Sequence, residues 1–147
     1  MKSILIATAF LAGAVLPIQV GLNHKMGKAV SDPVYAAFIS FVVGSIGLFL
    51  YLLATKTDLT TLPNARNVDW SVWTAGFLGA FYVASVIVLA PKLGVALTFG
   101  LVVAGQLSLS LIIDHFGLIG MPVHHINWQR IAGVLLIIGG VLMIRKF

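Results

Sequence analysis

The sequence predicts an all-α integral membrane bundle of five transmembrane helices, formed as a single domain over residues 1–147. Hydrophobic residues make up 60% of the chain and charged residues only 9%, whereas a soluble domain carries about 25% charged residues. Four apolar stretches are 19 to 21 residues long, and a hydrocarbon core about 30 Å thick needs about 20 helical residues. A fifth stretch is shorter but extends back to Trp128. The five stretches are Ile4–Leu22, Val34–Ala54, Val72–Ala90, Leu93–Ile113 and Ile131–Ile144.

The first helix is expected over about residues 3–23. Lys2, the apolar run and the small residues at 12–14 faintly resemble a secretory signal peptide. The apolar run continues beyond these small residues, and four further stretches follow it. We therefore favour a first helix that is retained over a signal peptide that is cleaved.

Chain-breaking residues separate the remaining helices. Asp32-Pro33 marks the start of the second helix, because both residue types are typical of helix starts. Pro91-Lys92 predicts a tight turn between the third and fourth helices. Trp128 suits a headgroup anchor at the start of the fifth. These helices are expected over about residues 33–54, 71–90, 93–114 and 128–145.

An odd number of helices places the two termini on opposite sides of the membrane. Orientation follows the imbalance of Lys and Arg between the two sides, and here the two counts are four and five. Either a partner chain or an early-inserting helix fixes the orientation, or copies insert both ways and pair antiparallel. We favour the second explanation, which gives a homodimer of two five-helix halves in an inverted arrangement. The side of the N-terminus carries Lys2, Lys56, Arg66 and Arg130, and the opposite side carries Lys25, Lys28, Lys92, Arg145 and Lys146.

Polar side chains recur on one face of the fourth helix. Thr98, Gln106, Ser110 and Asp114 recur at intervals of eight, four and four residues, which places them on the same side. An amide in hydrocarbon needs hydrogen-bond partners. These groups either form hydrogen bonds between helices or line a pathway for a substrate or water. A stripe of several polar groups favours the lining.

The first and third helices add candidates for the same lining. Gln19 and Asn23 follow Pro17 in the first helix, and Tyr82 lies in the third. Proline in a helix interior removes one backbone hydrogen bond. The resulting kink is either a packing feature or a hinge beside a binding cavity, and the sequence favours neither.

Two further groups indicate contact surfaces. Gly133 and Gly140 lie seven residues apart on one face of the fifth helix, which suits contact between subunits. Packing within one chain is the alternative. Trp73, Phe77 and Phe81 lie at four-residue spacing and either form an aromatic wall for a cation or planar solute or contact core and lipid, which is the commoner arrangement.

Other functions are disfavoured by composition and pattern. Asp114, at the end of an apolar stretch, either carries a proton in each transport cycle or lies solvated at a helix end, and we favour the latter. Histidines without cysteine form a weak metal pattern, so no metal or cofactor is expected. The basic residues lie singly at span ends, so we expect no nucleic-acid binding. No catalytic arrangement is present, and enzyme chemistry is not expected.

The sequence resembles a known family of membrane transporters. The fourth-helix runs Gly105–Leu111 and Asp114–Leu118 are similar to the short five-helix branch of the drug/metabolite transporter superfamily, the YdcZ-type inner-membrane exporters. Gly13, Pro17 and Asn23 in the first helix fit the same pattern. The resemblance covers essentially the whole chain. It implies a working unit of two five-helix halves, as in ten-helix relatives, and a location in the bacterial inner membrane.

This resemblance implies a small-molecule exporter that works by alternating access as a dimer in the lipid bilayer. The distantly similar small multidrug resistance transporters rely on a membrane-embedded glutamate, and this chain has no glutamate. We therefore expect neutral or zwitterionic metabolites, or anions attracted by helix N-termini, rather than organic cations. A non-transporting structural or regulatory subunit paired with another chain is the alternative. A channel is disfavoured, because only the fourth helix has a clear polar face.

Overall fold

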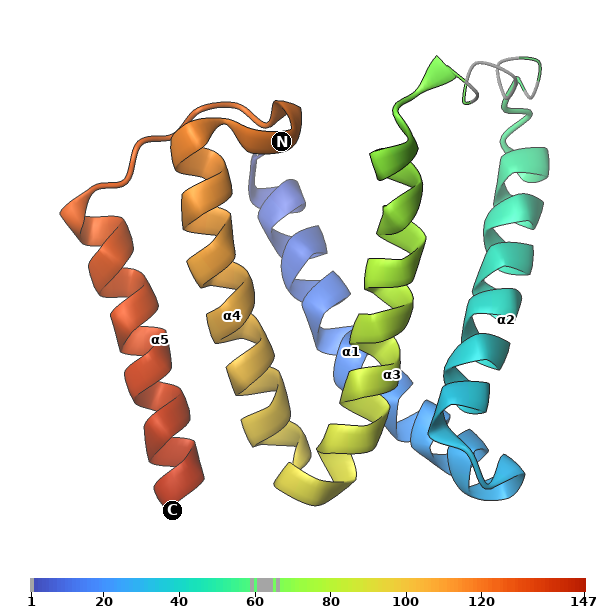
Figure 1. The fold of residues 1–147 in the computed structure, drawn as a ribbon, viewed down its shortest axis with the longest axis horizontal. Coiled ribbons are helices and arrows are strands. Elements are labelled where there is room, and N and C mark those ends of the chain that lie inside the picture. Colours follow the sequence, from blue (N-terminus) through green and yellow to red (C-terminus); the bar gives the residue numbers. More distant parts are fainter. Residues whose placement is uncertain (1, 59, 61–64, 66) are drawn as a thin grey trace. The chain divides into compact units, whose positions relative to one another are not determined.

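The computed structural model describes residues 2–58, 60, 65 and 67–147. This part of the chain contains helices and no strand, which confirms the predicted all-α class. Two short 3-10 helices, η2 (Trp70–Thr74) and η3 (Leu118–Gly120), lie before α3 and after α4. The α-helices, labelled in Figure 1, are α1 (Lys2–Val30), α2 (Pro33–Ala54), α3 (Ala75–Leu93), α4 (Val95–Phe116) and α5 (Trp128–Lys146).

Within the described residues, five helices are long and apolar enough to cross a membrane, as the sequence predicted. Their lengths run from 19 to 29 residues when η2 is counted with α3. The longest is α1, which continues to Val30, so Lys25 and Lys28 lie on its last turns and not in a connection. Arg66, one member of the charge balance, lies outside the described residues. The inverted pairing of two halves stays a prediction.

Most large apolar side chains are exposed rather than packed within the chain. Phe10, Phe77 and Leu136 are between 76% and 78% exposed. An apolar surface of this extent is unfavourable in water, whereas acyl chains or a neighbouring helix can cover it. The fold therefore has the exterior of a membrane protein. The buried apolar side chains among the described residues are Val20, Ala36, Ala37, Val86, Ile87, Ala90 and Val141.

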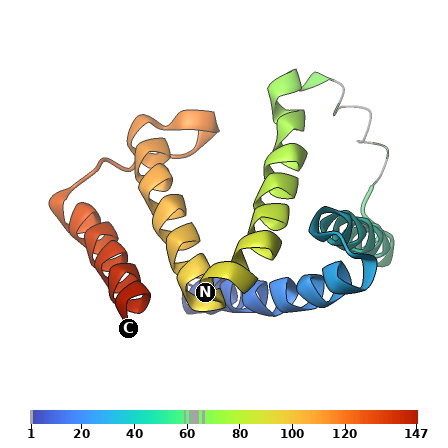
Figure 2. The same cartoon turned by 60° about the horizontal axis from the view of Figure 1, so that its bottom comes forward.

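The chain divides into two compact units, Met1–Val88 and Leu89–Phe147. In the first unit α1 packs against α2, and a tight turn joins them (Figure 2). The backbone N–H of Asp32 donates to the carbonyl of Gly27 over 3.0 Å. A Cβ at Gly27 would lie 3.4 Å from the Cα of Pro33, which places the end of α1 in contact with the start of α2.

The start of α2 is held by its own sequence. The Asp32 carboxylate accepts hydrogen bonds from the backbone N–H groups of Val34 (2.6 Å) and Tyr35 (3.1 Å), which otherwise have no partner within the helix. Pro33 suits the first helical position because its missing N–H is not needed there. The predicted helix start at Asp32-Pro33 is therefore confirmed.

In the second unit, the turn before α4 lies at Gly94, and the prediction of a turn at Pro91-Lys92 was wrong. Gly94 has a φ of 86°, a conformation that glycine adopts without strain. Proline is held at a φ of about −65° and fits the last turn of α3 instead. The Gly94 carbonyl accepts hydrogen bonds from the N–H (3.1 Å) and the hydroxyl (2.8 Å) of Thr98, which fixes the start of α4.

Helices α4 and α5 lie side by side and run in opposite directions (Figures 1 and 2). Gly100 of α4 faces the buried side chain of Val141 in α5. A Cβ at Gly100 would lie 2.8 Å from Cγ2 of Val141, which is closer than two carbon atoms can approach. Because valine in a helix is held in one rotamer, it has little room to move. The missing side chain of Gly100 therefore sets the approach of these helices.

Replacing this glycine should loosen the second unit. Gly100→Ala should lower the free energy of unfolding, because overpacking costs about 1 to 3 kcal/mol and the better helix propensity of alanine returns only about 1 kcal/mol. Thermal unfolding of the purified protein in detergent measures the change. Gly105→Ala, on the same helix, is the matched control, since a Cβ at that position meets no atom within 4 Å. Equal melting temperatures for the two variants would contradict the proposed contact.

Candidate functional site

A small pocket whose lining includes three polar side chains lies among the three helices of the first unit. Its volume is about 220 Å³. Gln19 contributes an amide from α1, and Ser40 and Ser45 contribute hydroxyls from α2. Hereafter this is the polar pocket; it is lined by Gln19, Ser40, Phe41, Gly44, Ser45, Leu48 and Val83.

The helical repeat of α2 explains how this pocket forms. Its lining residues follow the pattern i, i+1, i+4, i+5 and i+8 from Ser40 to Leu48, which is one face of an α-helix. Gly44 lies in the middle of that face, and a Cβ there would meet no atom within 4 Å. The two serines therefore flank an open space that the glycine leaves unfilled.

The polar groups of this pocket differ from three hydroxyls elsewhere in the spans. Thr8, Thr98 and Ser108 each donate to the backbone carbonyl four residues earlier, over 2.8 to 2.9 Å. Within the part of the chain that the structure describes, no hydrogen bond engages the side chains of Ser40, Ser45 or Gln19. Their hydrogen-bonding capacity is available to a solute or to water.

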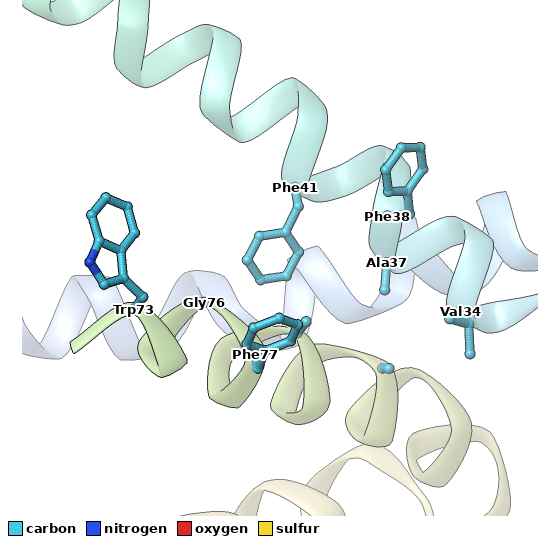
Figure 3. Close-up of a pocket in the computed structure, with 9 residues that line it drawn as sticks. Val34, Ala37, Phe38, Phe41, Trp73, Gly76 and Phe77 are labelled. Carbon is cyan, nitrogen blue, oxygen red and sulfur yellow. The ribbon is translucent and has the colours of Figure 1, made fainter. Parts of the chain in front are cut away.

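A larger apolar pocket lies between α2 and α3 in the same unit, with a volume of about 460 Å³. Phe41 projects from α2 toward α3, while Trp73 and Val34 lie at opposite ends of the pocket (Figure 3). Phe41 contributes to the lining of both pockets. We call this the aromatic pocket; it is lined by Val34, Ala37, Phe38, Phe41, Trp73, Gly76, Phe77, Ala80 and Ala84.

The structure brings together some of the predicted site residues. Gln19 lines the polar pocket, and Trp73 and Phe77 line the aromatic pocket. Ser40 and Ser45 were not among the residues predicted from the sequence. Their helical spacing around Gly44 was the signal that could have found them.

Other predicted residues of the first unit lie outside these two linings. Tyr82 is half-buried on α3, and Asn23 is buried on α1 with a side-chain nitrogen, Nδ2, that has no hydrogen-bond partner among the described residues. The helix α1 runs unbroken through Pro17. The roles of Asn23 and Tyr82 as lining residues and of Pro17 as a hinge stay predictions.

The predicted stripe of the fourth helix lies in the second unit. Gln106 and Ser110 are both exposed on α4, and no hydrogen bond engages their side chains within the described residues. Their role in a substrate lining stays a prediction. Gly133 and Gly140 lie on α5, where a Cβ at either would meet no atom within 4 Å. The predicted contact of these glycines with another subunit therefore meets no obstruction from their own unit.

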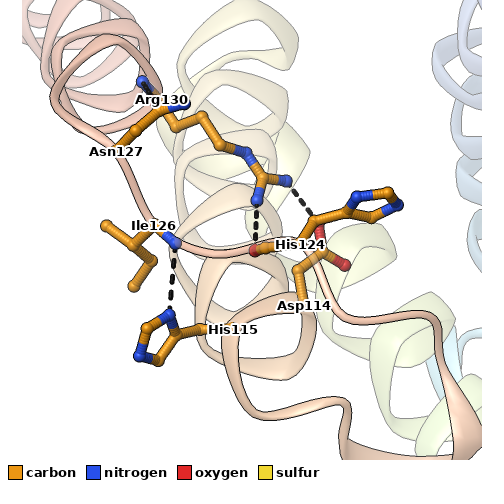
Figure 4. A network of polar contacts seen from close by, with 6 residues as sticks. All are labelled: Asp114, His115, His124, Ile126, Asn127 and Arg130. Atoms are coloured by element: carbon orange, nitrogen blue, oxygen red, sulfur yellow. Dashed lines mark hydrogen bonds and ion pairs between the residues drawn. The ribbon is translucent and has the colours of Figure 1, made fainter.

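Asp114 takes part in a network that joins the end of α4 to the start of α5 (Figure 4). Its carboxylate pairs with the guanidinium of Arg130, and both side chains are about 30% exposed. The same guanidinium donates to the carbonyl of His124 over 2.8 Å, and the N–H of His124 donates to the carbonyl of Asp114 over 2.8 Å. The network therefore holds the connection between these helices against the end of α4.

His115 and Asn127 complete this connection. The ring nitrogen Nδ1 of His115 accepts a hydrogen bond from the backbone N–H of Ile126 over 3.1 Å. The Asn127 side chain caps α5 by accepting from the N–H of Arg130 over 2.8 Å. Within the described ranges, no group of three or more acidic, histidine or cysteine side chains is placed to hold a metal ion.

Comparison with known proteins identifies relatives along the whole chain. A family model described as "Putative inner membrane exporter, YdcZ" matches residues 4–143. The chain is similar to "Inner membrane protein YdcZ" of Escherichia coli (strain K12), with 27% identity over 146 residues. The alignment covers 99% of this chain and 97% of that protein. No solved structure matches the chain.

The orphaned amide of Asn23 leads to a test of its role. Asn23→Leu should raise the free energy of unfolding by about 1 kcal/mol, because it removes a buried donor without a partner. Thermal unfolding in detergent measures the change, and Gln19→Leu, at an exposed position, should give no comparable gain. A loss of stability in Asn23→Leu would contradict the absence of a partner for this amide.

Proposed function

The chain belongs to the YdcZ family of inner-membrane exporters, and on that premise we propose that it exports a small molecule by alternating access as a dimer. The substrate binds by hydrogen bonds and apolar contact in a cavity lined by polar groups of the spans. The proposed lining comprises Gln19, Asn23, Tyr82, Gln106 and Ser110, to which the structure adds Ser40 and Ser45 as neighbours of Gln19.

The observation that carries this proposal is the set of unpaired polar groups in strongly apolar helices. An unsatisfied amide in hydrocarbon costs several kcal/mol, so such groups persist where protein, water or a solute satisfies them. Groups that only clip helices together would be expected to have a partner. Gln19, Gln106 and Ser110 have none within the described part of this chain. Their availability supports a lining that exchanges partners during transport.

A dimer is supported by what one chain leaves uncovered. Leu136 on α5 is 77% exposed and lies beside Gly139 and Gly140 in an open apolar hollow. Small residues beside large ones allow two helices to approach closely in a membrane. With five spans and nearly balanced charges, we propose that the second copy is inserted the other way round.

Asp114 is the candidate for a proton-carrying group in this scheme. A coupling role would act through the pair with the Arg130 guanidinium, which joins the end of α4 to the connection before α5. The pair is only partly buried, so its contribution to stability is small, about 0 to 1 kcal/mol. We propose coupling only as the alternative to the favoured role of Asp114, that of a solvated residue at the end of α4.

Removal of the central amide tests the proposed cavity. Gln106→Ala should abolish export and leave membrane insertion and dimerisation unchanged, because the amide binds substrate and does not hold the helix in place. Mass spectrometry of the medium from cells with and without the chain identifies an exported compound, and its efflux rate is then compared between variants. Ser108→Ala is the matched control, since its hydroxyl is bonded to the Ala104 carbonyl. Unchanged efflux from Gln106→Ala would remove this residue from the site.

The proposed dual orientation has a separate test. Two reporters, one active only in the cytoplasm and one active only outside the inner membrane, are fused after Phe147. We expect both fusions to be active in the same strain, because charges of four and five on the two sides give no strong bias. Activity of a single reporter would show a fixed orientation.

A further inference from the structure

We propose that the polar pocket and the aromatic pocket together bind one uncharged amphiphile, a molecule with an aromatic body and a hydrogen-bonding end. The aromatic body lies between α2 and α3, and the polar end meets Gln19, Ser40 and Ser45. This inference rests on the proposed function, since it names the substrate class of an exporter.

The two pockets share a wall, which makes them parts of one site. Phe41 lines both of them, and its ring lies 3.5 Å from the position of a Cβ on Gly79, so α3 limits its movement on that side. Phe77 of α3 lines the aromatic pocket together with Phe41 (Figure 3). A planar group placed beside Phe41 would contact aromatic faces in preferred stacked or edge-on geometries. From there a polar substituent reaches the adjacent pocket.

The polar side chains that line the polar pocket define the polar end of the ligand. The Gln19 amide offers both donors and an acceptor, and each of the serine hydroxyls can donate or accept. A carboxamide, alcohol or urea group satisfies such a mixed set. A ligand with no hydrogen-bonding end would leave these groups unsatisfied, which discriminates strongly against it.

The charge of the ligand follows from the lining residues. Among the described residues, neither pocket is lined by an ionisable side chain. Asp32 lies two residues before Val34 in the sequence, but its carboxylate is occupied by two backbone donors at the start of α2. A charged ligand would enter a low-dielectric site without a counter-charge, which is unfavourable. An aromatic surface alone can also attract an organic cation, so the test includes one.

Two glycines provide a way to fill the site without disturbing the fold. Gly44 lines the polar pocket and Gly76 lines the aromatic pocket, and a Cβ at either position meets no atom within 4 Å. A larger side chain at these positions would therefore occupy ligand space before it met protein. Gly47 also has open space around it, lies on α2 and lines neither pocket. It is the matched control.

The experiment measures binding of 2-naphthamide to the full chain in lipid nanodiscs by equilibrium dialysis, with empty nanodiscs as the blank. We expect Gly44→Leu and Gly76→Leu each to weaken binding by at least about tenfold, a change of about 1.4 kcal/mol, and Gly47→Leu to bind as the unmodified chain does. Gln19→Leu should weaken binding to a similar degree, while Ser108→Ala should not. The isosteric anion 2-naphthoate and cation 2-naphthamidine should bind at least about tenfold more weakly than the amide.

Several outcomes would overturn this inference. Equal binding by Gly44→Leu and Gly47→Leu would place the probe elsewhere. Retention no greater than that of empty nanodiscs would show no binding, the result expected if lipid or a second copy fills the aromatic pocket. Tighter binding of 2-naphthamidine than of 2-naphthamide would show that the aromatic side chains select an organic cation. Binding of the expected kind without export of the amide would leave this site standing and count against the proposed function. Export of another compound without binding of 2-naphthamide would count against this site and leave the proposed function standing.

Discussion

Hydrogen-bond satisfaction inside a hydrocarbon solvent is the constraint on which this structure depends. Helices satisfy the backbone within each span, which is why the described chain crosses the apolar layer as helices and contains no strand there. Ser108 and Thr98 satisfy their hydroxyls on the carbonyl one turn earlier. Gln19 and its two serine neighbours do not, within the described residues. A function that exchanges solutes across the membrane gives such groups a reason to remain unpaired.

Glycine serves two opposite purposes in the two units. At Gly100 the side chain of Val141 from the neighbouring helix occupies the space that a Cβ would take, and the result is a tight contact. At Gly44 the space stays open, and the result is a pocket between hydroxyls. Sequence position alone does not separate these cases, because both glycines lie within apolar spans. The difference arises from what the facing helix presents.

The sequence predicted the helices well because span length and hydropathy are set by the thickness of the bilayer. It also predicted the start of α2, since Asp32 and Pro33 act locally. It misplaced the next turn, because Pro91 is tolerated in the last turn of α3 and Gly94 supplies the positive φ. The serines of the polar pocket were missed because a serine bonded to its own helix and a serine facing a cavity look alike in sequence. The pairing of Asp114 with Arg130 depends on the path of the connection between α4 and α5.

Cysteine accessibility tests most directly whether the unpaired polar groups face a wettable space. The chain has no cysteine, so Ser45→Cys and Ile46→Cys each introduce one thiol on α2, the first in the polar pocket and the second on an exposed apolar face. A water-soluble methanethiosulfonate reagent attacks the thiolate, which forms where water reaches the sulfur. In lipid we expect Ser45→Cys to react at least about tenfold faster than Ile46→Cys, since ionised thiol is disfavoured in apolar surroundings. Equal rates, or no reaction at position 45, would contradict the account.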